Sequence, residues 1–348
     1  MSRLLDVLKG LDAAVLLVAV MVIAYVFQQR GVLTAVYAWT ARRLGSRKLL
    51  LTLVAALLGL LPIPGRISVA SSVLETLQKP GEKEPRFGII AYLAAHHYYL
   101  WSPMEKSVVI ALGGLGLSYA QFLGMMAWPL VVVLAVCFGY IALFISEKDI
   151  ALAAGGDAAT SPRGHLLDAA LFLAGFVAAG VGLNVALVFG GLAIFYVARH
   201  RVPWREALGH VNWKLVAVVV GVVLFAAGLR VYADELRQAL EDFVKGHGLT
   251  PVYAGALTFT LSLILGSSSR YSAVAVVATL IYGMDTFVFF FLVDYAGYLL
   301  SPTHKCVWIG KMYFDTPLSR YYRVIGLVAL LMIGYGLATL GLGVGAQV

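Results

Sequence analysis

The sequence predicts an all-α polytopic membrane protein built from two inverted-topology repeats, each with a re-entrant helical hairpin and a broken transmembrane helix. Composition is the first observation, because 61% of the 348 residues are hydrophobic and only 13% are charged, against about 25% in soluble domains. The second is a pair of polar islands in very apolar sequence, residues 60–75 and 261–276. The third is a Ser-Pro pair that follows each island inside another apolar segment. Together they predict about eight full crossings and two hairpins.

The first repeat covers residues 1–146 and begins with an apolar run that we interpret as a retained span. This run is too long for a signal peptide and lacks a small-residue cleavage site. An amphipathic arm, a hairpin, a broken helix and a last span follow it. The five elements are expected at residues 11–29, 31–45, 49–77, 87–118 and 121–145.

The second repeat covers residues 212–348 and has the same order of elements. They are expected at residues 213–230, 231–246, 250–283, 285–313 and 321–344. An order of five elements that recurs is difficult to obtain by chance. Aligning the two repeats places Arg66 opposite Arg270 and Lys106 opposite Lys305.

The hairpins are inferred from turn residues in the middle of apolar segments. Pro62 and Pro64 interrupt residues 49–77, and Gly266 with three serines interrupts residues 250–283. Each arm then has about 14 residues and reaches about 21 Å at 1.5 Å per residue, which is less than the hydrocarbon layer of about 30 Å. Arms of this length suit hairpins that enter the membrane and return to the same side.

The broken helices are inferred from the Ser-Pro pairs at 102–103 and 301–302. Proline ends one helix and can begin another at its first turn. In the first break, Ser102 and Glu105 also have the S-x-x-E spacing of a capping box. This spacing predicts a helix that starts with Pro103 at its first position.

The region between the repeats, residues 147–211, is expected to hold a loop and two linking scaffold spans. These spans are placed at 166–182 and 183–198, with Asn184 and its flanking glycines as the turn. The alternative is one long tilted helix, which would change the parity of the crossings.

The 26 Lys and Arg residues are distributed unevenly over the predicted topology. One side of the membrane receives 17 of them and the other side 5. The loops on the basic side are 30–48, 79–86, 146–165, 199–214 and 311–323. The positive-inside rule makes this side cytoplasmic and places both termini on the extracytoplasmic side of a cell (inner or plasma) membrane. The net charge of +8 is thus explained by topology, and no basic domain indicates a nucleic-acid partner.

Arg66 and Arg270 each follow a predicted hairpin turn, near the start of the returning half-helix. Unpaired N–H groups and the helix dipole favour an anion there, and a guanidinium adds a bidentate partner for carboxylate, sulfate or phosphate. We therefore predict that at least one of these arginines contacts an anionic substrate. The alternative is an internal ion pair with Asp294 or Glu105 that only fixes the hairpin tips.

Hydroxyl groups surround the predicted tips and breaks, and they complete the predicted substrate site. These serines are Ser68, Ser267, Ser268, Ser269 and Ser272 in the hairpins, and Ser102 and Ser301 at the breaks. They can bind substrate oxygens or a coupling Na⁺. The alternative for any single serine is close packing, since small residues let helices approach in lipid.

Titratable residues in or beside the broken helices are the candidates for coupling to H⁺ or Na⁺. They are Asp294, His304, His97, His96, Lys106, Lys305 and Glu105. Histidine titrates near neutral pH, and Asp294 is the deeper of the two acids of the second broken helix. Glu105 has the alternative role of a helix cap, and each lysine that of an ion-pair partner.

No resident metal or cofactor is expected from the sequence. His96 and His97 are adjacent, so they would point to different faces of a helix, and no carboxylate or cysteine completes a ligand set with them. The only cysteines, Cys137 and Cys306, lie in apolar surroundings without metal-ligand spacing.

With these hairpins, breaks and intramembrane arginines, the chain resembles the ion transporter superfamily, which includes gluconate, citrate, dicarboxylate and arsenite carriers. The segments GRIS at Arg66 and GYLLSPTHKC at 297–306 are most similar to the DUF401 integral membrane proteins. The resemblance implies a central anion site between inverted repeats, a homodimer and elevator-type alternating access. The chain lacks the Ser-Asn-Thr tip motif of the sodium-dicarboxylate branch and has fewer scaffold helices before the first hairpin, which leaves the coupling ion and the dimer interface open.

These observations predict a secondary active transporter of a small anion, a carboxylate or an inorganic oxyanion, driven by H⁺ or Na⁺, and not an enzyme. The sequence contains no nucleophile and base pair and no intramembrane protease motif. Two alternatives stay open: an anion channel or facilitator, and a membrane protein that handles phosphorylated lipid head groups. Paired hairpins with paired broken helices favour the transporter.

Overall fold

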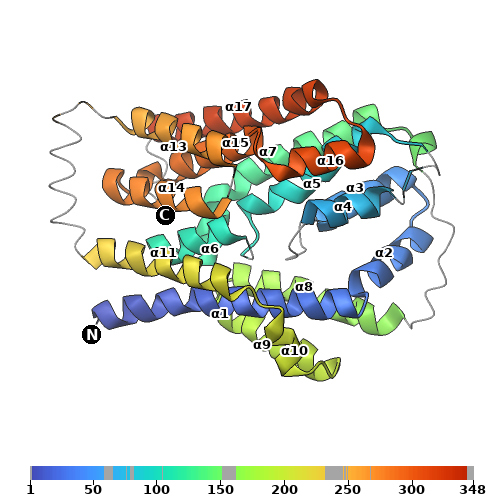
Figure 1. Cartoon of the computed structure of the whole chain (residues 1–348), viewed down its shortest axis with the longest axis horizontal. Helices are drawn as coiled ribbons and strands as arrows, with labels where there is room; N and C mark the ends of the chain where they lie inside the picture. The colour runs from blue at the N-terminus through green and yellow to red at the C-terminus, as the bar shows by residue number, and fades with distance from the viewer. Residues whose placement is uncertain are drawn as a thin grey trace.

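The computed structural model is all-helical over the residues that it describes. These are residues 2–58, 66–75, 77–78, 82–103, 105–150, 162–231, 246, 248, 250–266 and 268–342. The helices run mostly along the long axis of the molecule (Figure 1). This part of the chain contains no strand, as the predicted fold class requires.

The helices fall into three consecutive groups along the chain. The first group is α1 (Ser2–Gln29), α2 (Val32–Arg43), α3 (Arg47–Leu58), α4 (Arg66–Glu75), α5 (Pro85–His96), α6 (Lys106–Leu115) and α7 (Tyr119–Phe144). The second is α8 (Pro162–Gly180), α9 (Val185–Arg199) and α10 (Trp204–Gly209). The third is α11 (Trp213–Val231), α13 (Pro251–Leu265), α14 (Ser268–Tyr282), α15 (Phe287–Leu300), α16 (Lys305–Phe314) and α17 (Leu318–Leu342). Single 3₁₀ turns occur as η1 (His97–Leu100), η2 (Glu147–Asp149) and η3 (Met284–Thr286).

Two of the described helices, α7 and α17, are each long and apolar enough to cross a membrane. A third span results if Met284–Leu300 and Lys305–Phe314, which meet at a bend of 42°, are one broken helix. Several shorter apolar helices accompany them, including Val185–Arg199 and Pro251–Leu265. The protein is thus a multi-pass membrane protein in which many helices are shorter than the hydrocarbon layer.

Both predicted helix breaks are present, but the helix after the first break begins later in the chain than the sequence suggested. α6 begins at Lys106, with Glu105 as its extended N-cap residue (φ −82°, ψ 133°). The capping box with Pro103 at the first helical position is therefore wrong. Before this helix, the Glu105 N–H donates to the Ser102 carbonyl at 3.0 Å. His304 has the corresponding N-cap position before α16.

The two halves of the chain show matching helix contacts. α3 and α4 pack on α5, as α13 and α14 pack on α15. The contacts also cross between the halves, because α4 packs on α16 while α14 packs on α6. In Figure 1, α3 and α4 lie toward the right-hand end of the molecule and α13 and α14 toward the left-hand end. The helix pair of each half thus meets the broken helices of both halves.

The region between the halves contains two helices, α8 and α9, which contact each other. The turn lies at residues 181–184, and the Asn184 side chain caps α9 by accepting the Leu187 N–H at 3.0 Å. A single long helix across residues 166–198 is therefore excluded. The predicted arm at 31–45 corresponds to α2, whereas most of the predicted arm at 231–246 lies outside the described residues.

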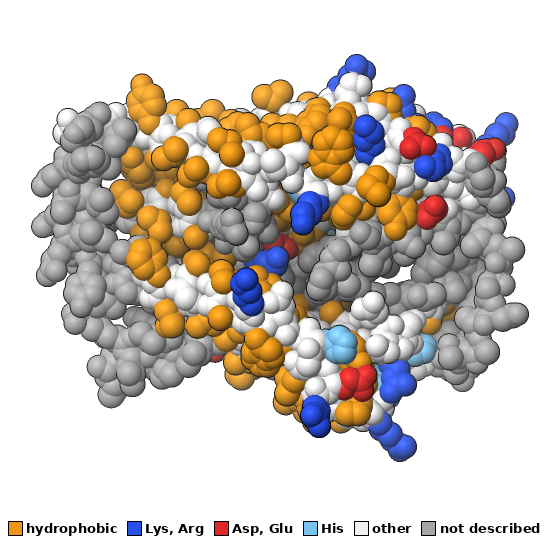
Figure 2. Space-filling view, in the orientation of Figure 1, with side chains coloured by type: hydrophobic (Ala, Val, Ile, Leu, Met, Phe, Trp, Pro, Cys, Tyr) orange, Lys and Arg blue, Asp and Glu red, His pale blue; other side chains and the backbone are white. Residues whose placement is uncertain are grey.

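The five loops that the sequence placed on the basic side are direct neighbours. Contacts between them join Arg30 to His200, Ser46 to Glu147, Lys83 to Asp315, and Arg86 to Asp149. Figure 2 shows most of the coloured charged side chains in the right-hand half and near the centre of the view, whereas the coloured side chains of the left-hand half are mainly hydrophobic. The hydrogen bonds from Arg86 also hold the pKa of the Glu84 carboxyl below its usual range. Which side of the membrane this end faces stays a prediction from the charge count.

Two glycines let α13 and α15 approach closely. A Cβ added at Gly297 would overlap the Phe259 carbonyl oxygen and lie 2.9 Å from Ser262 Cβ. At Gly255 it would overlap the Phe289 ring. Small residues at such interfaces are what allow helices to pack closely in lipid.

Gly297→Ala is expected to destabilise the protein by about 2 kcal/mol, because the methyl group has no space and the backbone of α13 must move. The measurement is the thermal unfolding midpoint of the purified protein in detergent. Gly326→Ala on α17 is the matched control, since a Cβ there meets nothing within 4 Å. Equal midpoints for the two variants would show that the interface is not tightly packed.

Candidate functional site

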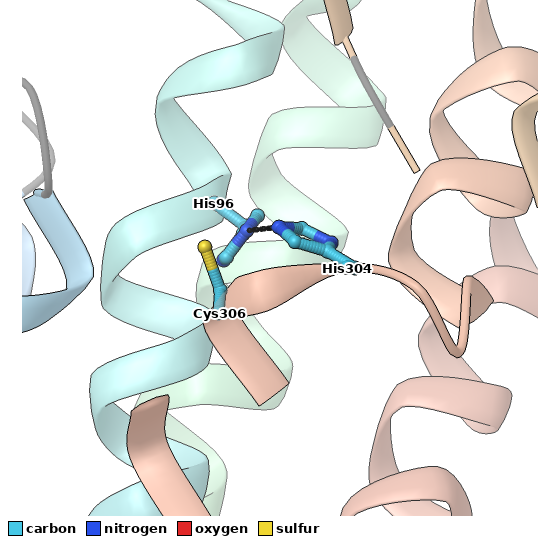
Figure 3. A group of neighbouring side chains, drawn as sticks. All are labelled: His96, His304 and Cys306. Atoms are coloured by element: carbon cyan, nitrogen blue, oxygen red, sulfur yellow. Dashed lines mark hydrogen bonds between the residues drawn. The ribbon is translucent and has the colours of Figure 1, made fainter. Parts of the chain in front are cut away.

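A cluster of buried polar side chains lies where the broken helices meet. His96 ends α5, and His304 lies in the break between α15 and α16. Both are buried, and their Nε2 atoms are 3.2 Å apart. Figure 3 shows the two imidazole rings pointing toward each other, with Cys306 of α16 beside them.

Asp294 is a buried carboxylate in the middle of α15. Ser262 of α13 donates a short hydrogen bond to its Oδ1 atom, and Ser272 of α14 is a second hydrogen-bond partner. Asp294 thus joins both helices of the pair α13 and α14 to the broken helix. A charge at such a buried position in a membrane protein is costly and usually functional.

The turn after α13 lies directly against the second break. Gly266 has a left-handed backbone (φ +56°), and a Cβ there would lie 2.7 Å from Ser301 Oγ and 3.1 Å from the His304 nitrogen. Thr303 Oγ1 is 2.9 Å from Ser301 Oγ and donates to the Ile264 carbonyl at 3.1 Å. Only glycine combines this conformation with this close approach. The predicted tip of the second hairpin and the predicted break of the second helix are therefore one structural unit.

The first break is held by a different set of contacts. His97 Nδ1 accepts a hydrogen bond from Trp101 Nε1 at 2.9 Å. Its Nε2 atom therefore carries the proton and faces the Ala55 carbonyl of α3 at 3.4 Å. Tyr119 donates to the Trp101 carbonyl at 2.6 Å. His97 has the contacts of a residue that positions the break, whereas His96 faces the second half of the chain.

The predicted arginines lie at helix starts, and only their backbones are described. Arg66 is the first residue of α4, and Arg270 is in the first turn of α14. Their side chains, and those of Ser68, Ser268 and Ser269, lie outside the described part of the structure, as does Ser267 altogether. Contact of these residues with a substrate stays a prediction.

The remaining predicted residues lie at or beside the two breaks. Ser102 and Ser301 are buried, and Ser272 is buried on α14. Lys106 and Lys305 are the first residues of α6 and α16, with Lys106 half-buried and Lys305 exposed. Glu105 is buried at the N-cap of α6. Predicted site residues thus lie at or beside the N-termini of four helices, α4, α6, α14 and α16. Each of these N-termini favours negative charge.

Ser262, Thr303 and Tyr92 belong to this site, and the sequence analysis missed all three. Ser262 had a detectable signal, because Gly255, Thr258 and Ser262 form a stripe of small residues at helical spacing and are the buried residues of α13. Nothing in the sequence distinguishes Tyr92 from the other tyrosines of the chain. Its hydroxyl donates to the Leu299 carbonyl at 2.9 Å and lies 3.2 Å from His304 Nδ1.

The sequence analysis found no cysteine near enough in the chain to complete a metal-ligand set with the histidines, but the structure brings Cys306 close to His96 and His304. His96, His304 and Cys306 each offer one ligand atom, and these atoms lie within 4.8 Å of one another. His96 and His97 do point to different surroundings, as predicted. His304 and Cys306 belong to the other half of the chain, so local spacing cannot reveal that they lie near His96.

A comparison with protein families finds one match that covers most of the chain. The model of the family CitMHS, described as citrate transporter, matches residues 6–299. The matched range includes the first break, both described helix pairs and Asp294. A search of the curated proteins found no match. The family agrees with the resemblance to the ion transporter superfamily, and the closer likeness to DUF401 stays a prediction.

Proposed function

Because this chain belongs to the CitMHS citrate transporter family, we propose that it is a secondary transporter that carries citrate or a related small carboxylate together with protons. The proposal that protons are the coupling ion rests on the buried Asp294 and its serine partners. The proposal that the substrate is citrate or a related carboxylate rests on the family and on the helix N-termini at the predicted site.

Proton coupling is favoured over Na⁺ coupling by the ligands that surround Asp294. Its described partners are the hydroxyls of Ser262 and Ser272, and a hydroxyl can donate to the charged carboxylate and accept from the protonated acid. A carboxylate that is charged in one state and neutral in the other changes its cost of burial by several kcal/mol. Protonation of Asp294 can therefore be linked to one orientation of the carrier, which is what coupled transport requires.

The substrate site is proposed between the starts of α4 and α14, with Arg66 and Arg270 as its cations. The matching contacts of α3 to α5 and of α13 to α15, and the crossed contacts of α4 and α14, support two inverted repeats with re-entrant hairpins. A citrate ion carries several carboxylates, and two guanidinium groups from opposite hairpins suit such a ligand. The elevator movement and the homodimer are proposed from the resemblance alone.

The test uses the purified full-length protein in proteoliposomes and labelled citrate. We expect uptake that follows an inwardly directed proton gradient, is abolished by a protonophore and shows counterflow with unlabelled citrate inside. Sulfate and phosphate are tested as competitors and are expected to be weaker than citrate.

Three outcomes would overturn parts of the proposal. Uptake that follows a Na⁺ gradient at equal pH would refute the proposal that protons are the coupling ion. Uptake that is insensitive to ionophores and shows no counterflow would indicate a channel or facilitator. Stronger competition by sulfate or phosphate would indicate that the substrate is an inorganic oxyanion and not a carboxylate.

A further inference from the structure

We propose that His96, His304 and Cys306 form a binding site for a transition-metal ion such as Zn²⁺, which links the two broken helices. The three ligand atoms lie within 4.8 Å of one another, and Figure 3 shows them converging from α5, from the second break and from α16. This inference is independent of the proposed transport function, because it concerns only the affinity of the folded protein for a metal ion.

The hydrogen bonds of the two histidines leave both Nε2 atoms as acceptors. His96 Nδ1 lies 2.5 Å from the Tyr92 carbonyl oxygen, and His304 Nδ1 lies 3.1 Å from the Tyr298 carbonyl oxygen. A carbonyl oxygen can only accept, so each neutral ring carries its proton on Nδ1. Two Nε2 lone pairs then face each other across 3.2 Å. The repulsion between two such lone pairs is relieved by a proton that the two nitrogens share or by a metal ion that both bind.

The separation of the nitrogens suits two ligands of one tetrahedral ion. With Zn–N bonds of about 2.0–2.1 Å, two imidazole nitrogens are about 3.3–3.4 Å apart, close to the 3.2 Å between His96 and His304. A thiolate at about 2.3 Å from the ion would be about 3.6 Å from each nitrogen. The three ligand atoms lie within 4.8 Å of one another, so reaching a sulfur–nitrogen separation of about 3.6 Å requires an approach of about 1.2 Å or less.

The outer contacts are those of metal-binding histidines. Such residues usually donate their second ring N–H to a carbonyl or carboxylate, which fixes the ring and its tautomer. His96 and His304 both do so toward backbone carbonyls, and the Tyr92 hydroxyl lies 3.2 Å from His304 Nδ1. The rings are thus held in place without the metal.

The ligand types specify the class of metal. Imidazole with thiolate is preferred by Zn²⁺ and Cu ions, whereas Mg²⁺ and Ca²⁺ require oxygen ligands. Three protein ligands leave the fourth tetrahedral position for water or another small ligand. Because His96 comes from the first half of the chain and the other two ligands from the second, a bound ion would hold the halves in this arrangement.

The experiment titrates Co²⁺, a spectroscopic substitute for Zn²⁺, into the metal-free full-length protein in detergent. We expect saturation at one ion per chain, strong visible bands of tetrahedral Co²⁺ and a near-ultraviolet thiolate-to-cobalt band. Zn²⁺ should displace the Co²⁺ and raise the unfolding midpoint. His96→Ala and His304→Ala should each weaken binding by on the order of 100-fold or more, since even loss of an outer partner costs 10–100-fold.

Cys306→Ser separates this site from adventitious binding. It should remove the thiolate band, whereas the matched control Cys137→Ser, on α7, should retain it. A monodisperse wild-type protein without a thiolate band overturns the proposal, whatever the variants do. A band that persists in Cys306→Ser, or binding that is unchanged in both histidine variants, also overturns it.

Discussion

Replacing Asp294 by asparagine is expected to abolish uptake of citrate against its gradient while leaving exchange of internal for external citrate intact. Asparagine has the shape of the protonated acid and can still accept the Ser262 hydroxyl, but it cannot release a proton. The carrier would then change orientation only when loaded with substrate. We expect uptake driven by a pH gradient to fall roughly tenfold or more, the size expected when a buried charged partner is lost.

The matched control for this variant is Asp285→Asn. Asp285 lies in η3, just before α15, and is exposed. Its substitution therefore removes an acid from the same segment without changing the buried site. Asp285→Asn should retain accumulation driven by the proton gradient. If Asp294→Asn still accumulates citrate, the coupling role of Asp294 is refuted, and the family assignment is unaffected.

Neutralising the two predicted substrate arginines should raise the concentration of citrate at half-maximal uptake. A charge-assisted hydrogen bond contributes about 1.5–3 kcal/mol, so Arg66→Gln or Arg270→Gln is expected to weaken apparent affinity about 10- to 150-fold. Lysine at either position retains the charge but not the bidentate geometry and should give an intermediate loss. The measurement is the concentration dependence of counterflow, which does not depend on proton coupling.

Arg320→Gln is the control for the arginine variants. Arg320 is exposed at the start of α17, at the end of the molecule where the basic loops meet, so its loss should leave affinity unchanged. An effect at only one of the two predicted positions would mean an asymmetric site. Unchanged uptake and affinity in both Arg66→Gln and Arg270→Gln would show that the anion binds elsewhere.

The helix breaks could be predicted from the sequence because their cause is local. Proline has no N–H and fixes its own φ, so a Ser-Pro pair in an apolar segment favours a helix break, although Pro129 lies inside the continuous helix α7. The point where the next helix begins was less predictable. Glu105 has the spacing of a capping box residue, yet it is the N-cap of α6, which begins only at Lys106, and its own N–H is bonded to the Ser102 carbonyl.

The sequence by itself determined the membrane class, the helical fold, the two breaks and the clustering of the basic loops. Each of these depends on composition or on short-range periodicity, which any window of the chain reveals. Only the tertiary structure decided which polar groups meet. Ser262 and Asp294 are 32 residues apart, and His96 and His304 are 208 residues apart. Both pairs depend on the packing of helices that are distant in sequence, within the second half for Ser262 and Asp294 and between the halves for His96 and His304. That packing depends on close approaches such as Gly297 against Phe259, which local sequence does not reveal.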